Sequence, residues 1–352
     1  MAYSNIDKPN QYFNTVLYTG NGSTQTITGV GFQPDLVWLK NRSNSLWWHI
    51  LVDAVRGAGI TLSSNVTNSE FGTGSNIIPD FDPDGFDLNV NPNATGNENS
   101  SSYVAWNWKA GGTASSNTDG SITSTVSANT TSGFSIVSYT GNGSAGATIG
   151  HSLGVKPSLM IFKDRDNVRD WIVYHKDLGA TKFIKLNLTD ASGTSSAYFN
   201  NTEPTSSLFT VGSGTSVNNS GTDYIAYCFA EKKGFSKFGK YTGNGSDTDG
   251  TFIYTGFKPA WVMTKKITDS TSANWLIQTA DGLNPYNPVN QQSLRANLID
   301  AALNAYDMDF LSNGIKMYND SSNANETSKE FIYMAFAENP LVGSNLVPNN
   351  AR

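Results

Sequence analysis

The sequence predicts an all-β protein built from three tandem antiparallel β-sandwich, jelly-roll-like repeats. Two observations predict this fold class. Only 15% of the 352 residues are charged, and the abundant Gly, Asn, Ser and Thr residues favour turns and strands over helix interiors. The hexapeptide YTGNGS also occurs three times, at residues 18–23, 139–144 and 241–246. This spacing fits whole small domains and is too long for the units of a solenoid.

Four further landmarks follow the hexapeptide in the same order in all three copies. They are a strand that begins Gly-x-x-Pro, a tryptophan six residues before an aspartate, a hydrophobic residue three before an asparagine, and a closing aromatic run. They occupy residues 31–40, 154–163 and 256–265; Trp47 with Asp53, Trp171 with Asp177 and Trp275 with Asp281; Leu62 with Asn65, Ile184 with Asn187 and Leu294 with Asn297; and residues 103–108, 224–229 and 331–336.

These landmarks divide the chain into three units with flanking segments. The segments are an N-terminal arm (1–12), the first unit (13–112), a Ser/Thr/Gly-rich linker (113–132), the second unit (133–233), the third unit (234–339) and a C-terminal tail (340–352). The composition of the linker is typical of a flexible connection. Only Ala-Glu-Lys-Lys-Gly separates the last two units. We therefore expect the second and third units to pack rigidly and the first to sit more independently.

Each unit is expected to open with a strand, because its first residues are β-branched and aromatic. The Thr-Gly-Asn-Gly that follows has turn chemistry, since Asn-Gly adopts the positive φ angles of tight hairpin turns. The proline then begins a strand whose continuous apolar run predicts a central position with both faces covered. In the closing strand, alternation places Tyr103 and Ala105 on one face and Val104 and Trp106 on the other.

One segment gives conflicting signals. Residues 291–306 place Leu294, Leu298 and Ala302 at helical spacing. Parity with the other units instead predicts a strand at 293–298, followed by a turn or two of helix at 301–306.

Composition excludes several classes of function. The net charge of −6 and the pI near 5.1 argue against nucleic acid as a partner, because phosphate contacts need clustered Lys and Arg. No apolar run approaches the ~20 residues that cross a bilayer, and the start lacks a signal-peptide core, so we expect no membrane insertion. The single cysteine, Cys228, excludes an intrachain disulfide.

Two loops invite a binding interpretation. The hexapeptide resembles a phosphate-cradling loop only in its glycines, because strand-like residues follow it and no lysine does, which favours a turn. Asp82, Asp84 and Asp87 lie close together in FDPDGFDL, where calcium is one reading and an ordinary Asp-Pro-Asp-Gly turn is the favoured one. Whether these aspartates bind a cation stays open, and we assign no metal or cofactor residues.

No catalytic residues are assigned. The three histidines, His49, His151 and His175, lack ligand spacing and equivalent positions, and no nucleophile signature is present. Cys228 lies in the closing strand of the second unit, where a small buried side chain is the favoured reading. An acid pair for glycoside hydrolysis stays open among the 29 acidic residues.

The remaining recurrent residues have structural readings. The aspartates at 53, 177 and 281 and the lysines at 40, 163 and 265 recur, and we expect each lysine to pair with the aspartate of its own unit. Most of the eight tryptophans are expected to fill the core, although aromatic faces also stack on sugars. Trp48 has no aromatic counterpart in the other units and is the candidate for a ligand-binding surface contact.

The run YFNTVLYTGNGS, GFQPDLVWLKNRS, DAVRG, FDPDGFDL and YVAWNWKAGG in the first unit resembles a repeat found in virion structural and tail-fibre-like proteins of marine tailed bacteriophages. The second and third units match at the hexapeptide, the Gly-x-x-Pro strand and the closing strand, but lack DAVRG and WNWKAGG. The resemblance brings no catalytic residues with it.

The resemblance implies a non-enzymatic protein of the virion surface that is assembled in the host cytoplasm and binds other virion proteins of the capsid or tail. We expect a capsid decoration or head/tail accessory protein, because the chain lacks coiled-coil heptads and a repetitive fibre shaft. The alternative is a tail fibre or receptor-binding protein that recognises host surface glycans. A polysaccharide-degrading enzyme is a third reading. Such phage proteins are often trimers, so a homotrimer stays open.

Overall fold

The structure is a computed structural model that describes residues 4–72, 77–89, 95–269, 273–280, 292–304 and 308–344. All the strand pairs named in it are antiparallel, apart from an isolated parallel bridge between Ile122 and Ile149. Within these residues, helix is confined to single turns, which are η1 (Pro9–Gln11), α1 (Ser196–Phe199) and α2 (Thr215–Asn218). The predicted all-β class is confirmed.

Each unit contributes four strands to a main sheet, in the order opening, closing, central and fourth strand. In the first unit these are β1 (Phe13–Thr19), β7 (Ser102–Trp108), β3 (Leu36–Asn41) and β4 (Ile50–Asp53). In the second they are β10 (Phe134–Thr140), β17 (Asp223–Phe229), β12 (Leu159–Asp164) and β13 (Ile172–His175). In the third they are β18 (Ser236–Thr242), β26 (Glu330–Pro340), β20 (Phe257–Lys266) and β21 (Leu276–Thr279).

Further strands extend two of these sheets. At the edges of the second sheet lie β14 (Lys182–Lys185) with β15 (Gly193–Thr194), and β9 (Ser124–Asn129) with β8 (Ser115–Asn117). In the third sheet, β22 (Gln292–Arg295) and β23 (Leu303–Asn304) continue from β21. The strand expected at 293–298 is present over its first half as β22, and residues 296–298 form a turn. The helix expected after it is wrong at residues 303–304, which pair with β22, while residues 305–306 lie outside the described ranges.

A smaller sheet covers one face of each main sheet. These sheets comprise β2 (Gln25–Ile27), β6 (Gly85–Leu88) and β5 (Phe81–Asp82); β11 (Ala147–Gly150) and β16 (Leu208–Val211); and β19 (Phe252–Tyr254), β25 (Gly314–Met317) and β24 (Met308–Leu311). In the first unit, Ile27 and Phe86 pack with Val37 of the central strand in one buried cluster. The other two units have their own clusters between the same pair of layers.

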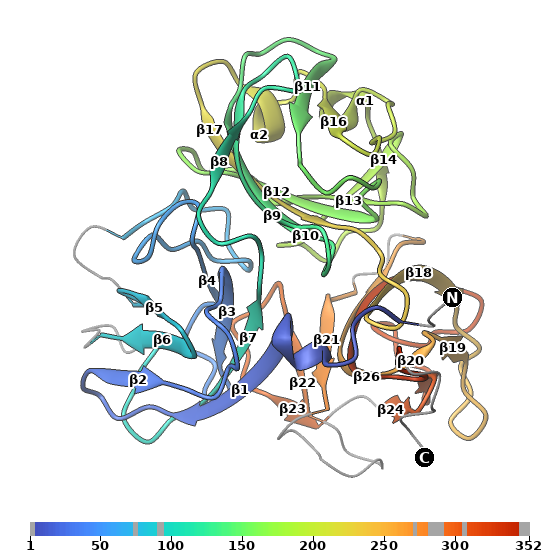
Figure 1. Ribbon diagram of the computed structural model, residues 1–352. Coiled ribbons are helices and arrows are strands. Elements are labelled where there is room, and N and C mark those ends of the chain that lie inside the picture. The colour runs from blue at the N-terminus through green and yellow to red at the C-terminus, as the bar shows by residue number, and fades with distance from the viewer. Residues whose placement is uncertain are drawn as a thin grey trace.

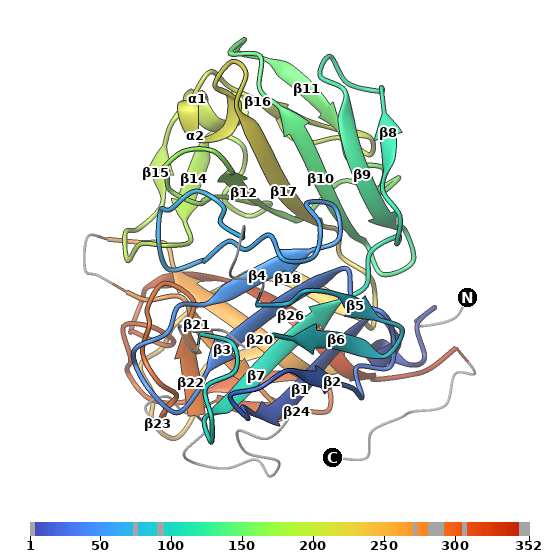
Figure 2. The same ribbon diagram turned by 90° about the vertical axis from the view of Figure 1, so that its left-hand side faces the viewer.

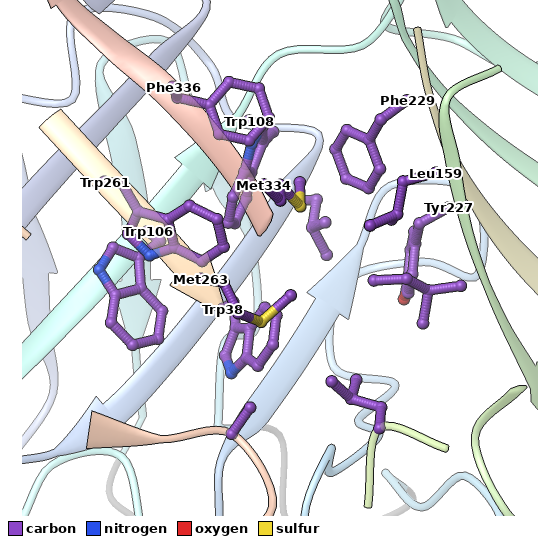
Figure 3. Close-up of a cluster of buried hydrophobic side chains, with 14 of the residues drawn as sticks. Trp38, Trp106, Trp108, Leu159, Tyr227, Phe229, Trp261, Met263, Met334 and Phe336 are labelled. Carbon is purple, nitrogen blue, oxygen red and sulfur yellow. The ribbon is translucent and has the colours of Figure 1, made fainter. Parts of the chain in front are cut away.

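The opposite faces of the three main sheets meet in one central core (Figure 1). Trp108, Phe229 and Phe336 occupy the same register position in their closing strands, opposite Leu36, Leu159 and Trp261 of the central strands. Their ring centroids are 6.3 Å (Trp108–Phe229), 5.8 Å (Trp108–Phe336) and 6.0 Å (Phe229–Phe336) apart. Figure 3 shows these rings converging with the surrounding tryptophan and methionine side chains. Every unit thus supplies an equivalent ring to the centre.

Alternation along the strands explains both sets of cores. Trp38 and Leu36 face the central core, whereas Val37 and Leu39 face the small sheet of their own unit. The central strand is therefore buried on both faces, as its continuous apolar run predicted. The closing strand follows the same rule.

The linker expected at 113–132 is instead part of the second unit's main sheet. Strand β9 pairs with β10 along its length, and β8 pairs with β9. Val126 of β9 is buried against that unit's core. The composition is Ser/Thr-rich, but Ser124, Thr125 and Val126 alternate between buried and exposed positions, as residues of a half-buried strand do. The first unit is also not independent, since the central core joins all three (Figure 2).

Candidate functional site

In the sequence, a tryptophan stands six residues before an aspartate in each unit. The structure shows that in the first unit a different residue takes the place of this tryptophan. The backbone N–H groups of His49, Trp171 and Trp275 each donate to an asparagine Oδ1, at 2.9 Å in every case. The acceptors are the recurrent Asn65, Asn187 and Asn297. His49, and not Trp47, is therefore the equivalent residue, and it stands directly before β4 as Trp171 and Trp275 stand directly before β13 and β21.

These three equivalent rings link the units. Trp171 Nε1 donates to Ser63 O of the first unit at 2.9 Å. Trp275 Nε1 donates to Lys185 O of the second unit at 2.8 Å. His49 Nε2 lies 3.0 Å from Arg295 O of the third unit, and its Nδ1 accepts the indole N–H of Trp38 at 2.9 Å. Each unit thus reaches the preceding one, and the first reaches the third.

His49 fits this position only as the neutral imidazole. Its Nδ1 accepts a hydrogen bond, so its Nε2 carries the proton that is donated to the carbonyl. Burial holds the pKa of His49 well below its usual range. A protonated ring would have no acceptor for the Trp38 indole.

The lysines that end the central strands bind across the same junctions. Lys40 Nζ donates to Ile299 O at 2.9 Å, Lys163 Nζ to Thr67 O at 3.3 Å, and Lys265 Nζ to Thr189 O at 2.8 Å. All three side chains are buried. Burial lowers the pKa of Lys40 and of Lys163 to about 8 and that of Lys265 to about 7.

The expected pairing of each lysine with its own aspartate is wrong where it can be followed. Asp53 Oδ2 instead binds Arg56 Nε at 2.5 Å, and Asp177 Oδ2 lies 3.9 Å from His175 Nδ1. Asp281 lies outside the described residues. In the antiparallel register, Asp53 lies opposite Leu36, at the other end of the central strand from Lys40.

A buried charged network occupies the junction between the first and second units. Asp53 and Arg56 have fully buried side chains, and the Tyr227 hydroxyl of the second unit donates to Asp53 Oδ2 at 2.8 Å. Arg165 of the second unit binds both carboxylate oxygens of Glu70, each at 2.9 Å. The DAVRG motif supplies Asp53 and Arg56, so its function in the structure is to hold this junction.

The hexapeptides form corners between sheets and not the expected hairpins. Strand β1 pairs with β7 of the main sheet, while β2 pairs with β6 of the small sheet, so the loop passes from one layer to the other. The glycines after the asparagine have φ angles of 70°, 75° and 65°, in the region that favours glycine. These are Gly22, Gly143 and Gly245.

A further recurrent asparagine, which the sequence analysis missed, satisfies these corners. Asn97 Oδ1, Asn218 Oδ1 and Asn325 Oδ1 accept the N–H of the hexapeptide asparagine, at 2.9, 2.8 and 3.1 Å. Each stands six residues before the first aromatic of its closing run, at Tyr103, Tyr224 and Phe331, so its spacing was a readable signal. Because these N–H groups already donate to side chains of the protein, we interpret the hexapeptides as corners between sheets and not as phosphate-binding loops.

The aspartates of FDPDGFDL also accept hydrogen bonds from residues of their own unit. Asp84 accepts the N–H groups of Gly29 and Gly31 at 3.0 and 2.6 Å, and Asp87 Oδ1 accepts the Thr26 hydroxyl at 2.6 Å. Asp82 ends β5, one residue from the turn into β6. Within the described ranges, no three His, Cys, Asp or Glu side chains gather as a set that could bind a metal ion.

The other reactive groups are buried. Cys228 lies in the core of the second unit, as expected, and burial raises the pKa of its thiol. His151 Nε2 lies 3.3 Å from Thr205 O, and His175 Nε2 lies 3.3 Å from Tyr333 O. Burial lowers the pKa of both imidazoles to about 4.

Trp48 lies at the surface, with 36% of the residue exposed, and its ring meets Phe71 edge-on at 6.2 Å. Leu46, two residues earlier, is also exposed, while Ser45 Oγ accepts the N–H of Ala301 of the third unit at 3.0 Å. The loop before β4 thus exposes apolar side chains. Its binding function stays a prediction.

Among the residues that the structure describes, no helix is long and apolar enough to span a lipid bilayer. Neither a curated protein nor a solved structure matches the chain. One family model matches residues 8–340, which includes all three units and the junctions between them. The chain therefore belongs to the family described as a domain of unknown function, DUF7483.

Proposed function

We propose that this protein is a structural protein of the bacteriophage particle surface, a capsid decoration or head/tail accessory protein that acts by protein–protein assembly. In this proposal the three units are tandem jelly-roll-like β-sandwich repeats arranged around a pseudo-threefold core. It has no catalytic function, is located in the virion and binds other virion proteins of the capsid or tail.

The observation that carries the proposal is the triangle of Trp108, Phe229 and Phe336. Equivalent residues of the three units meet there at centroid distances of 5.8 to 6.3 Å. Closed symmetric assemblies bring equivalent surfaces of separate subunits together around an axis. Here one chain does so with three of its own units, which gives a single rigid body with three similar lobes, suited to a site of threefold symmetry on a particle.

The recurrent polar residues support the same reading. The lysines, the ring N–H groups and the DAVRG motif form hydrogen bonds between the units of the chain. They do not converge on one cavity. Large, rigid contacts of this kind suit a protein that carries load on a particle. A homotrimer of such chains stays an alternative that multi-angle light scattering of the purified protein distinguishes from a monomer.

The test is the location of the protein in intact particles. Cryo-electron microscopy of the virion, with labelling by an antibody to this chain, is expected to place it on the capsid or at the head–tail connection. Absence of the chain from purified particles, measured by mass spectrometry, would contradict the proposal. Reducing ends released from a bacterial polysaccharide by the pure protein would replace it with the enzyme reading.

The second candidate is a tail fibre or receptor-binding protein that recognises host glycans. The exposed Trp48 on the loop before β4 favours it, because an exposed aromatic face can stack on a sugar ring. Label at the tail tip, together with loss of adsorption to host cells in a Trp48→Ala phage, would favour this candidate over the first.

A further inference from the structure

The outer face of the small sheet in the third unit differs from its counterparts in the other two units. Phe252 and Tyr254 stand on edge strand β19, with 47% and 53% of each residue exposed. Ile253 between them faces the core of the unit. Because alternate residues of a strand share a face, both rings lie on the solvent side, about 7 Å apart along the strand. Figure 1 shows β19 at the outside of the third unit, away from the central core.

The fold does not require aromatic residues at these two positions. Ile27, Ile149 and Ile253 are buried at the equivalent position of the three strands, opposite Phe86, Phe209 and Ile315. The residues that flank the isoleucine are Thr26 and Thr28 in the first unit, Thr148 and Gly150 in the second, and Phe252 and Tyr254 in the third. Two copies of the same sheet thus form with small side chains, so the aromatic pair serves a purpose other than folding.

The Phe252 ring reaches over Gly314. A side chain placed on Gly314 of the neighbouring strand would come within 2.9 and 3.0 Å of two atoms of this ring. Phe252 therefore occupies the space beside the glycine, while 47% of the residue stays exposed. A flat aromatic face stacks on the C–H face of a pyranose sugar in the way that it stacks on other apolar surfaces.

Polar groups stand beside the rings on the same face. Lys316 lies opposite Phe252 in the register, and Asp309 lies opposite Lys316 on the next strand. Lys316 Nζ binds Asp249 Oδ1 at 2.8 Å, and the Tyr318 hydroxyl donates to Asp309 Oδ2 at 2.9 Å. The face thus combines ring faces with hydrogen-bond donors and acceptors, which sugar hydroxyls need together because each hydroxyl both donates and accepts.

We propose that the outer face of the β19–β25–β24 sheet, with Phe252 and Tyr254 as stacking platforms and Lys316 and Asp309 as hydrogen-bonding partners, binds a pyranose-containing glycan. The chemistry favours a glycan over an apolar protein segment, because charged residues adjoin the rings and Leu311 is the aliphatic residue of this face among those described. The proposal goes beyond a role in particle assembly and does not depend on where the protein lies in the virion.

The test uses the full chain on an array of defined neutral and acidic oligosaccharides, followed by titration of the strongest hit by calorimetry. The key variant is Phe252→Thr/Tyr254→Thr, which brings to the third unit the small side chains found in the others. We expect at least one pyranose oligosaccharide to bind, with affinity at least tenfold lower in this variant. The conservative Phe252→Tyr/Tyr254→Phe variant keeps both rings and is expected to retain binding.

Matched controls separate this face from the rest of the molecule. Thr26→Ala and Thr148→Ala, at the equivalent positions of the other units, are expected to leave binding unchanged. Absence of binding to every glycan on the array would overturn the proposal. Binding that survives Phe252→Thr/Tyr254→Thr, or that is lost in Trp48→Ala alone, would also overturn it, because the site would then lie elsewhere.

Discussion

The junction between the first and second units and the junction between the second and third units share a common plan but differ in charge. Both have a central-strand lysine and a ring N–H that donate to carbonyls of the neighbouring unit. The first junction adds the fully buried Asp53–Arg56 pair with Tyr227, and the bidentate Arg165–Glu70 pair. The second adds the Ser192 hydroxyl, which donates to Ile267 O at 3.0 Å, and a partly exposed ion pair between Lys237 and Glu231 at 2.7 Å.

The difference follows the connection between the units. The second and third units are joined within a few residues, so their relative positions are restricted by the chain itself. The first and second are joined through β8 and β9, so their contact has to be specified by side chains. A buried charged network is suited to this because each partner is costly to leave unpaired, which disfavours other arrangements. The comparison therefore predicts unequal effects of substitution at the two junctions.

The largest effect is expected where both junctions meet. Phe229→Ala removes a ring that contacts Trp108 and Phe336, and the cavity should cost about 3–5 kcal/mol. Because all three units share this core, hydrogen exchange should accelerate in β7, β17 and β26 alike. Mass spectrometry after exchange measures this directly.

The control for that substitution is Phe209→Ala, which removes a ring of similar size from the second unit's own core. Its faster exchange should stay within the second unit. If Phe229→Ala gave the same confined pattern, the central core would not couple the units.

The next largest effect separates the two junctions. Arg56→Met leaves Asp53 buried without its cation and should cost about 3–5 kcal/mol in the free energy of unfolding. The double variant Asp53→Leu/Arg56→Met removes both charges and should recover much of that loss. Chemical denaturation of the two variants measures the difference. Equal destabilisation by the single and double variants would show that packing, and not charge, holds this junction.

How far the sequence predicted this arrangement depends on the range of each interaction. Alternation and turn chemistry are local, so the strands at β1, β3 and β7 and the hexapeptide loops were readable. The pair Glu70–Arg165 joins distant segments and has no local pattern. The equivalence of His49 and Trp171 was hidden by the difference in residue type and by tryptophans nearby, because alignment by residue type selected Trp47. Asn97 was readable from its spacing but has a residue type common in this chain.

The exposed aromatic pair illustrates a different limit. Phe252 and Tyr254 have the β propensity of any strand, so their types alone do not distinguish a core position from a surface one. Alignment with Thr26 and Thr148 would have shown that aromatic residues are unusual at these positions. That alignment needs the position of the insertion after the third hexapeptide, which only the register of β19 against β25 gives. Sequence repeats therefore become most informative after the structure aligns them.

Acid should weaken the second junction through His175. Its Nε2 faces Tyr333 O of the third unit, and burial lowers its pKa to about 4, below the ordinary 6.5. The unfolded chain binds the proton first, so this contribution to stability is complete above pH 6.5 and is lost as the pH falls towards 4. The slope should be about 1.4 kcal/mol per pH unit at most for this group.

Urea unfolding at several pH values between 7 and 5 measures this slope. His151, whose pKa burial also lowers to about 4, adds a similar slope within the second unit. The variant His175→Gln should therefore reduce the slope without abolishing it, while the charged network of the first junction contains no histidine among its described contacts. A slope unchanged in His175→Gln would assign the acid sensitivity to other groups.

The smallest effect is expected from the hydroxyl at the second junction. Ser192→Ala removes the hydrogen bond to Ile267 O, but the Ser192 backbone N–H still donates to that oxygen at 3.2 Å, so the loss should be about 0.5–1 kcal/mol. Tyr227→Phe is the matched change at the first junction. It removes a hydroxyl that donates to a buried carboxylate, and hydrogen bonds to charged groups contribute about 1.5–3 kcal/mol. Urea midpoints of the two variants should therefore differ in that order. The reverse order would mean that the second junction relies on its polar contacts more than the first does, and that its short connection does not fix the two units by itself.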